Sequence, residues 1–250
     1  MLPKIFSLQG KRALVTGSSR GIGYAAAMTL AEAGAYMIFH ASKPSAKLDA
    51  ALAEARSRGF SGEATDADIS SADGLKKLIA AVGSVDILVL NASVQTYMTV
   101  EEFDTEEFKR EYQTNLLSSF ELIKAFLPGM RERRFGRIIA LGSVNQHRPS
   151  PKLCIYAGTK AAQANLILGL ARTNAKFGIT ANNIAPGVIT TDRNRAVLAD
   201  AETAEGIRKF IPAGRFGTAE DCAGLILLLA SDAGSYITGE DITIDGGMHL

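Results

Sequence analysis

Tyr156, Lys160 and Ser143 are residue types that can move a proton, and the first two are spaced as Tyr-x-x-x-Lys. On a helix, residues four apart share one face, so the Lys160 ammonium can lie beside the Tyr156 phenol. A nearby cation favours the phenolate and brings a tyrosine pKa from about 10 towards neutral pH. Such a tyrosine can donate or accept a proton in a reaction. The spacing alone is weak, since six tyrosines in an ordinary composition give roughly 0.3 chance matches.

A glycine-rich segment near the N-terminus, Thr16 to Gly23, indicates where a phosphate could bind. Its glycines are spaced GxxxGxG, directly after an apolar strand and at the start of a helix. Glycine lets the backbone approach a pyrophosphate, and the N-terminus of the helix offers free N–H groups and partial positive charge. A strained turn without a ligand is the alternative. The strand before it and the helix after it favour dinucleotide binding.

The elements that must position these groups alternate between strand and helix along the chain. Short apolar runs that end in small or polar residues predict strands at 12–16, 36–40, 85–90, 137–141, 180–184 and 241–244. Helices are predicted at 24–33, 47–58, 73–81, 105–133, 156–177 and 219–229. This alternation predicts an α/β fold, a Rossmann-type doubly wound parallel sheet of about seven strands with helices on both faces. Ligands bind at the carboxyl ends of such strands. We expect a single domain over residues 1–250.

The composition narrows the class of partner. The chain has 250 residues, 27 basic and 26 acidic side chains and a formal charge of +1, which gives no broad basic surface for nucleic acid and no basic amphipathic segment for a membrane. A small-molecule partner is therefore favoured. The chain has two cysteines, no metal-ligand spacing around His40 or His147, and neither a secretory signal nor a long apolar run. We expect no metal site and a cytoplasmic location.

Further polar residues are predicted to meet at the same edge of the sheet, and the combination resembles the short-chain dehydrogenase/reductase family over essentially the whole chain. The matching segments are Thr16-Gly-x-x-x-Gly-Ile-Gly23, Asp68-Ile69, Asn91-Ala92, Asn115, Ser143, Tyr156-x-x-x-Lys160, Pro186-Gly187-x-x-Thr190 and Asp245-Gly246-Gly247. One departure is visible, because the family often has Asn-Asn-Ala-Gly where this chain has Leu90-Asn91-Ala92-Ser93. Ser93 thus adds a side chain where the backbone is expected to approach a cofactor.

The resemblance implies a role for each catalytic candidate. Tyr156 would protonate the carbonyl oxygen as a hydride reaches the carbon, or deprotonate the alcohol in the reverse direction. Ser143 would hydrogen-bond the same oxygen and stabilise the charge that develops there. Lys160 would bind the nicotinamide ribose and promote ionisation of Tyr156. Asn115 would hold a water molecule that links Lys160 to solvent as a proton relay.

The second strand and the resemblance together imply NADP(H) as the cofactor. In NAD-dependent Rossmann folds an acidic residue at the end of the second strand binds the adenosine ribose. This chain has no acid between Tyr36 and Lys43, with Ala41 at or near the expected position. Ser42, Lys43 and Arg20 would instead contact a 2′-phosphate, although an exposed loop lysine is an equally good account of Lys43. NADP(H) is therefore preferred, with NAD(H) as the alternative.

The resemblance also places other residues along the cofactor, with Asn91 beside it, Asp68 at the adenine, and Ile189 and Thr190 at the nicotinamide carboxamide. The full set expected to bind the cofactor is Gly17, Ser19, Arg20, Gly21, Ile22, Gly23, Ala41, Ser42, Lys43, Asp68, Ile69, Asn91, Ala92, Tyr156, Lys160, Pro186, Gly187, Ile189 and Thr190.

The substrate is expected between residues 93–97, 144–155 and a lid at about 188–212. These segments carry polar side chains that slightly favour a polar or anionic substrate, namely Gln95, Asn145, Gln146, His147, Arg148, Arg193, Asn194 and Arg195. Exposed loops are polar in any case. Three functions stay open: a reductase or dehydrogenase of a small carbonyl or alcohol, a β-ketoacyl thioester reductase, and a nucleotide-sensing protein without turnover. The intact catalytic candidates favour an enzyme, because a binding protein needs no proton donor.

The helix at 156–177 also predicts self-association. Small residues between 157 and 175 let it pack closely on more than one side, namely Ala161, Ala162, Ala164, Gly169 and Ala171. The resemblance implies that this helix and the 105–133 region form a symmetric interface. We therefore expect a homo-oligomer, a tetramer or a dimer.

Overall fold

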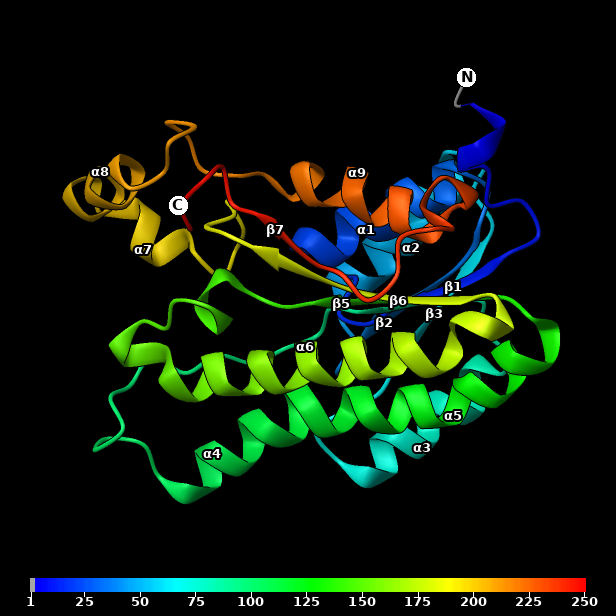
Figure 1. The fold of residues 1–250 in the computed structure, drawn as a ribbon, viewed down its shortest axis with the longest axis horizontal. Coiled ribbons are helices and arrows are strands. Elements are labelled where there is room, and N and C mark those ends of the chain that lie inside the picture. Colours follow the sequence, from blue (N-terminus) through cyan, green and yellow to red (C-terminus); the bar gives the residue numbers. More distant parts are fainter. Residues whose placement is uncertain (1–2) are drawn as a thin grey trace.

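A seven-stranded sheet in the order β3-β2-β1-β4-β5-β6-β7 forms the centre of the computed structural model, which describes residues 3–250 (Figure 1). The strands are β1 (Arg12–Val15), β2 (Tyr36–Ala41), β3 (Gly62–Asp66), β4 (Ile87–Leu90), β5 (Gly136–Leu141), β6 (Ile179–Pro186) and β7 (Asp241–Ile244). Every neighbouring pair is parallel. The chain builds the sheet outwards from β1 to β3 and then returns to add β4 on the other side of β1. This confirms the doubly wound, Rossmann-type sheet.

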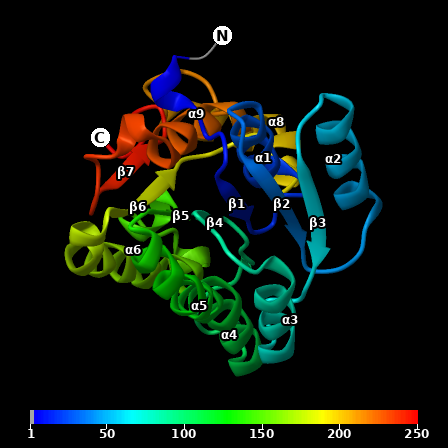
Figure 2. The same cartoon turned by 90° about the vertical axis from the view of Figure 1, so that its right-hand side faces the viewer.

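Helices cover both faces of the sheet (Figures 1 and 2). One face carries α1 (Gly21–Glu32), α2 (Ala46–Ser57) and α9 (Ala219–Ala230). The other face carries α3 (Ala72–Val82), α5 (Ser118–Arg133) and α6 (Cys154–Asn174). Three shorter helices complete the set: α4 (Thr105–Tyr112), which leads towards α5, and α7 (Arg195–Ala199) and α8 (Ala201–Lys209), which follow β6.

The central strands are apolar on both sides because each face of the sheet is covered. In β1 and β2, Leu14 and Ile38 pack in the layer of α3, α5 and α6, whereas Val15 and Phe39 pack in the layer of α1, α2 and α9. All four side chains are fully buried. A strand buried on both faces needs a continuous apolar run rather than an alternating one. The apolar runs therefore predicted these strands correctly.

Some elements differ from those predicted from the sequence. The strand β3, which was not predicted, lies at the edge of the sheet and is only half-buried throughout. An edge strand of this kind needs no apolar run, so its Gly-Glu-Ala-Thr-Asp sequence carries little strand signal. The helices α7 and α8 were also not predicted; α8 starts at an N-cap, Asp200, whose side chain accepts a hydrogen bond from the Thr203 N–H at 2.8 Å.

The single helix predicted at 105–133 is divided in the structure. A π-helical turn, Gln113–Leu117, separates α4 from α5 and contains Asn115. Such turns insert an extra residue into a helix and often occur at functional sites. The carbonyl oxygen of Asn115 accepts hydrogen bonds from the side chains of Ser119 and Gln163. Within residues 3–250, no helix combines the length and apolar character needed to cross a membrane.

Candidate active site

The glycine-rich turn between β1 and α1 needs its glycines for two different reasons. Gly17 and Gly21 have φ angles of 68° and 58°, in the left-handed region that other residues disfavour. A Cβ on Gly23 would lie 2.4 Å from Gly17 O and from Asn91 Nδ2, which is far too close. Within residues 3–250 no side chain caps α1, so its first-turn N–H groups can bind an anion. This cradle fits the pyrophosphate of a dinucleotide.

Part-buried hydrogen bonds join this turn to the end of β4. The Thr16 hydroxyl accepts hydrogen bonds from the backbone N–H groups of Asn91 and Ala92, each at 3.0 Å. The Asn91 side chain donates from Nδ2 to the carbonyl oxygens of Thr16 at 2.8 Å and Gly17 at 3.2 Å. Asn91 therefore supports the turn with both hydrogens of its side-chain amide.

His40, in β2, is a further support of the turn that the sequence patterns did not indicate. Its ring is 1% exposed, and Nε2 lies 3.0 Å from the Ala67 carbonyl oxygen. Because a carbonyl oxygen only accepts, Nε2 carries the proton and Nδ1 accepts a hydrogen bond from the Gly17 N–H at 3.1 Å. Burial lowers the pKa of His40. A protonated ring would point a second donor at the Gly17 N–H, so the site requires neutral histidine.

Ser143 follows β5 and is held by its neighbours in the next turn. Its Oγ accepts hydrogen bonds from the Asn145 backbone N–H at 3.2 Å and from Asn145 Nδ2 at 3.3 Å. Its own N–H donates to Gln146 Oε1 at 3.1 Å, and Gln146 Nε2 donates to Asp241 at 2.7 Å. Because Ser143 Oγ accepts these bonds, its hydroxyl hydrogen remains able to donate to another oxygen.

Tyr156 lies in the first turn of α6, with 5% of its surface exposed. Burial raises the pKa of its phenol and outweighs three opposing effects, from the Arg193 charge and from hydrogen bonds with Ser143 and Ser93. The phenol is therefore protonated at neutral pH in this structure. Ser93, the departure noted in the sequence, thus adds a second hydroxyl beside Tyr156.

Lys160 lies one turn further along α6 and is 1% exposed. Its Nζ donates to the Leu141 carbonyl oxygen at 2.6 Å and to Gln163 Oε1 at 3.2 Å, and lies 5.8 Å from the centre of the Tyr156 ring. Burial, together with the nearby Arg193 charge, lowers the pKa of Lys160 to about 7. The charged and neutral forms of Lys160 are therefore both populated near neutral pH.

Gln163 connects Lys160 to Asn115 and was not predicted as a site residue. Its Nε2 donates to Asn115 O at 3.2 Å and to Ser119 Oγ at 2.7 Å, while its Oε1 accepts from Lys160. The Asn115 side chain binds both backbone groups of Val94, at 2.8 and 2.9 Å. The resemblance implies a water molecule between Asn115 and Lys160; in the structure the Gln163 amide makes a direct connection.

Glu111 is a second buried residue that the sequence patterns did not single out. It is fully buried, and its Oε1 accepts a hydrogen bond from the Thr96 N–H. Within residues 3–250, its other oxygen, Oε2, has no partner. Burial raises the pKa of Glu111, and its charge raises that of Tyr156. Glu111 therefore orders the loop after β4 and acts electrostatically on Tyr156.

The residues predicted at the second strand lie close to the glycine-rich turn. Ala41 is buried at the end of β2, and Ser42 and Lys43 are exposed just beyond it. Arg20 is exposed, with Nη1 3.8 Å from a carboxylate oxygen of Asp192. Ser42, Lys43 and Arg20 are therefore open to solvent at the carboxyl edge of the sheet. Their contact with a 2′-phosphate stays a prediction.

The remaining predicted cofactor residues follow β3 and β6. Asp68 is exposed and its Oδ1 accepts two hydrogen bonds from Ser70, whereas Ile69 is buried. After β6, a Cβ on Gly187 would lie 2.6 Å from Asp245 Cβ, and the Thr190 hydroxyl donates to the Gly217 carbonyl oxygen at 2.6 Å. Two further predicted residues lie in the same segment, namely Pro186 at the end of β6 and the buried Ile189.

Comparison with known sequences identifies close relatives of this chain. A family model described as enoyl-(acyl carrier protein) reductase matches residues 17–249. The chain is 42% identical over 246 residues to the 3-oxoacyl-(acyl-carrier-protein) reductase FabG of Escherichia coli (strain K12), covering 98% of this chain and 99% of that protein. It is 33% identical over 250 residues to gluconate 5-dehydrogenase of Gluconobacter oxydans (strain 621H), covering 98% and 97%.

Comparison with solved structures also finds a 3-oxoacyl (acyl-carrier-protein) reductase and a gluconate 5-dehydrogenase. A 3-oxoacyl (acyl-carrier-protein) reductase from Agrobacterium tumefaciens C58 with NADP bound has a TM-score of 0.93 and 40% identity, covering 99% of this chain and 98% of that one. A gluconate 5-dehydrogenase from Burkholderia cenocepacia J2315, in complex with NADP and tartrate, has a TM-score of 0.91 and 34% identity, covering 98% and 97%.

These matches and the site together define the class of protein. The chain belongs to the short-chain dehydrogenase/reductase family of oxidoreductases, whose members act on CH–OH and C=O groups. Solved relatives of this chain carry bound NADP.

Proposed function

We propose that the protein is an NADP(H)-dependent oxidoreductase that transfers a hydride between nicotinamide and a small carbonyl or alcohol substrate. One observation carries the proposal: the Ser143 hydroxyl and the Tyr156 phenol lie together at the carboxyl edge of the sheet, with Lys160 one helical turn from Tyr156. The glycine cradle at the start of α1 supports the nucleotide part of this function. Oxidoreductase relatives with bound NADP support it independently.

The catalytic residues divide the proton chemistry between them. The protonated Tyr156 phenol donates its proton to the substrate oxygen in reduction and accepts it back in oxidation. Ser143, whose hydroxyl hydrogen is free to donate, stabilises the charge that develops on the same oxygen. Lys160 returns a proton to Tyr156 after the phenol has donated its own and would bind the nicotinamide ribose, and Asn115 supports Lys160 through Gln163. The bound nicotinamide cofactor supplies or accepts the hydride.

The end of β2 supports a preference for NADPH over NADH. Ala41 stands where an acidic residue would otherwise bind the adenosine ribose, and Ser42 and Lys43 are exposed beside it. A hydroxyl and an ammonium group suit a 2′-phosphate, whereas a carboxylate would repel it. Arg20 adds a second positive charge near the same edge.

The substrate is proposed to lie under segment 188–212, with residues 93–97 and 144–155 as its other walls in a single 250-residue domain. A second candidate function is reduction of β-ketoacyl thioesters, which the 42% identity to a 3-oxoacyl-(acyl-carrier-protein) reductase favours. We also propose a cytoplasmic location, which the free thiols of Cys154 and Cys222 support.

A substrate panel assayed by nicotinamide absorbance tests the function. Small oxo acids, sugars, alcohols and acetoacetyl thioesters are supplied with NADPH or NADP⁺ as appropriate. We expect turnover of at least one class, and we expect Tyr156→Phe to retain NADPH affinity while losing about 10²–10⁴ in kcat. Tight NADPH binding with no turnover of any compound would instead favour the nucleotide-sensing function. Activity of Tyr156→Phe near that of the unchanged protein would remove Tyr156 from its proposed role.

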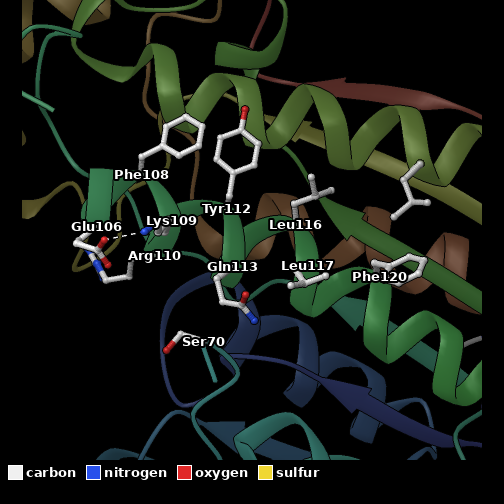
Figure 3. A pocket seen from close by; sticks show the side chains of 11 residues that line it. Ser70, Glu106, Phe108, Lys109, Arg110, Tyr112, Gln113, Leu116, Leu117 and Phe120 are labelled. Atoms are coloured by element: carbon white, nitrogen blue, oxygen red, sulfur yellow. Dashed lines mark hydrogen bonds and ion pairs between the residues drawn. The ribbon is translucent and has the colours of Figure 1, made fainter. Parts of the chain in front are cut away.

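The proposed enzyme is a homo-oligomer, a tetramer or a dimer, and an apolar groove on its surface supports this. The groove runs along α4 and α5 beside α6, with the Phe108 and Tyr112 rings stacked 4.4 Å apart at one end (Figure 3). Phe108, Leu117 and Phe120 are each about 40% exposed there. The outer side of α6 beside it is small, with Ala161 and Gly169 exposed. A second copy of this chain would cover these apolar groups.

Light scattering at micromolar concentration tests the assembly. We expect the mass of a tetramer or a dimer, and we expect Leu117→Glu to lower it because a carboxylate would be buried in the interface. Tyr236→Glu is the matched control, since Tyr236 is fully exposed outside the groove. A monomeric mass for the unchanged protein would contradict the proposal.

A further inference from the structure

Arg193 links the segment after β6 to the loop after β4, beside the catalytic residues. It lies in the segment after β6, and its Nη2 donates to the carbonyl oxygen of Ser93 at 2.7 Å and to Ser93 Oγ at 3.0 Å. Ser93 follows β4 and lies close enough to the Tyr156 phenol to lower its pKa. Ser93 therefore holds the Arg193 guanidinium near the Tyr156 phenol, which exchanges a proton with the substrate oxygen in the proposed mechanism.

Three nearby cations share one carboxylate partner, and Arg193 has none in the part of the chain that the structure describes. Arg20, Lys47 and Arg195 all contact the Asp192 carboxylate. Among residues 3–250, Arg193 has no carboxylate within 4.0 Å. Its Nε and Nη1 donors also have no acceptor in that part of the chain. Arg193 thus presents an uncompensated charge and unused hydrogen-bond donors beside the catalytic residues.

The charge of Arg193 destabilises the ammonium form of Lys160. The Arg193 guanidinium adds to burial in lowering the pKa of Lys160. Lys160 is buried and Arg193 is exposed; two nearby cations repel each other, and an anion bound close to them would relieve the repulsion. Arginine also binds carboxylates in a planar, two-pronged geometry that a single ammonium does not provide. The position and chemistry of Arg193 therefore suit an anionic ligand bound beside Tyr156.

We propose that Arg193, oriented by Ser93, binds a carboxylate of the substrate close to the carbon that is oxidised or reduced. The substrate class is then a short hydroxy acid or oxo acid. This inference rests on the proposed function, since it assigns the substrate of the same site. It adds Arg193 and Ser93 as specificity-determining residues.

Matched pairs of acids and esters test the proposal. Acetoacetate is compared with methyl acetoacetate, and pyruvate with methyl pyruvate, each with NADPH, so that only the negative charge differs. The measured quantity is the ratio of kcat/KM for the acid to that for its ester. We expect this ratio to fall by at least about tenfold in Arg193→Gln, and to recover in part in Arg193→Lys. The ratio is used because Arg193 also affects the pKa of Tyr156, which alters both substrates alike.

Arg215→Gln is the matched control, since Arg215 is an exposed cation that is paired with Asp221 and lies outside segment 188–212. We expect it to leave the acid-to-ester ratio within about twofold. An equal loss in both variants would show a general effect of charge and overturn the proposal, as would an unchanged ratio in Arg193→Gln. NADPH affinity is measured in parallel. A tenfold loss of NADPH affinity in Arg193→Gln would show that Arg193 binds an anionic group of the cofactor, and would also overturn the proposal.

A binding measurement separates failure of this inference from failure of the proposed function. If none of the four compounds is turned over, calorimetry with malonate on the protein saturated with NADP⁺ tests the carboxylate site directly. Binding that is at least about tenfold weaker in Arg193→Gln than in the unchanged protein supports the site. Equal binding by the two proteins, or none by either, overturns it.

Discussion

The two halves of the proposed active site are built from different kinds of contact. The proposed cofactor half, at the ends of β1, β2 and β4, is held by part-buried hydrogen bonds in which Thr16, His40 and Asn91 pair with backbone groups. The substrate half is held by side chains that lie largely in solvent, with Arg193 on Ser93 and three cations on Asp192.

The energies of these contacts predict how substitutions in each half affect activity and substrate preference. A buried polar group that loses its partner costs about 1–3 kcal/mol, whereas an exposed ion pair contributes about 0–1 kcal/mol. Substitutions in the cofactor half are therefore expected to weaken the enzyme towards every substrate. Substitutions in the substrate half are expected to change which substrate is preferred. Removing the charge of Arg193 should therefore leave the fold intact, whereas removing the Thr16–Asn91 pairing should destabilise it.

The largest effect is expected for Gly23→Ala in the cofactor half. The new Cβ would lie 2.4 Å from Gly17 O and from Asn91 Nδ2, so the turn must move. We expect NADPH affinity to fall by about a hundredfold, as for a steric cost of about 2–3 kcal/mol. Titration of NADPH fluorescence measures this. Gly224→Ala is the control, because its Cβ meets nothing within 4 Å on α9; equal affinities of the two variants would contradict the prediction.

The next effect concerns the choice of cofactor. Ala41→Asp places a negative charge where NADPH carries its 2′-phosphate, and two unit charges 4 Å apart interact by about 4 kcal/mol at an effective dielectric of 20. Solvent reduces this, so we expect a loss of about tenfold or more in the preference for NADPH over NADH, measured as a ratio of kcat/KM. Ala41→Asn has the same shape without the charge and should retain most of the preference. Equal or better efficiency of the unchanged protein with NADH would contradict the assignment.

A smaller effect, on the pH dependence of kcat/KM, is expected from substitutions of Gln163, which contacts Lys160. Gln163 Oε1 accepts a hydrogen bond from Lys160, whose pKa is about 7. Gln163→Leu removes an acceptor that favours the ammonium form, so the pKa of Lys160 should fall further. Gln163→Glu adds a negative charge and should raise it. The pH dependence of kcat/KM is therefore expected to shift by up to about one unit, in opposite directions in the two variants. Shifts in the same direction would exclude this account.

The smallest effect concerns stability at acid pH. Burial lowers the pKa of His40 in the folded protein below the value of about 6.5 expected when unfolded. The unfolded chain therefore binds a proton that the folded one cannot, and stability should fall as pH drops below about 6.5, by at most 1.36 kcal/mol per unit. His40→Gln keeps an acceptor for Gly17 but does not titrate. Its melting temperature should depend less on pH between 7 and 5 than that of the unchanged protein; identical slopes would refute this role for His40.

The parts of the molecule predicted from the sequence are those with short-range signals. Continuous apolar runs predicted the buried strands, because a strand covered on both faces has no polar side. The glycine turn was predictable because Gly17 and Gly21 need left-handed backbone and Gly23 needs space. The edge strand β3 lacks both signals, since it is half-buried and polar.

The parts that were missed depend on contacts between distant segments. His40 supports a turn 23 residues earlier, and Gln163 meets Asn115 across 48 residues. Arg193 was already expected in the substrate segment, but its contact with Ser93, across 100 residues, was not. Each is an ordinary polar residue in its local sequence, and its role follows only from the residue that the fold brings to it. A polar side chain inside an otherwise apolar strand, as at His40, is the one local sign that would have indicated a buried partner.

The pairing of Thr16 with Asn91 and Ala92 has a consequence for how the chain is made. These hydrogen bonds join residues 75 and 76 positions apart, and β1 pairs with β4 only after β2 and β3 have been synthesised. At roughly 5–20 residues per second on the ribosome, the glycine turn waits roughly 4–15 seconds for its support. During that interval one edge of β1 lies open to other chains. The glycine turn is therefore synthesised well before it reaches its final geometry, which requires β4 to join the sheet.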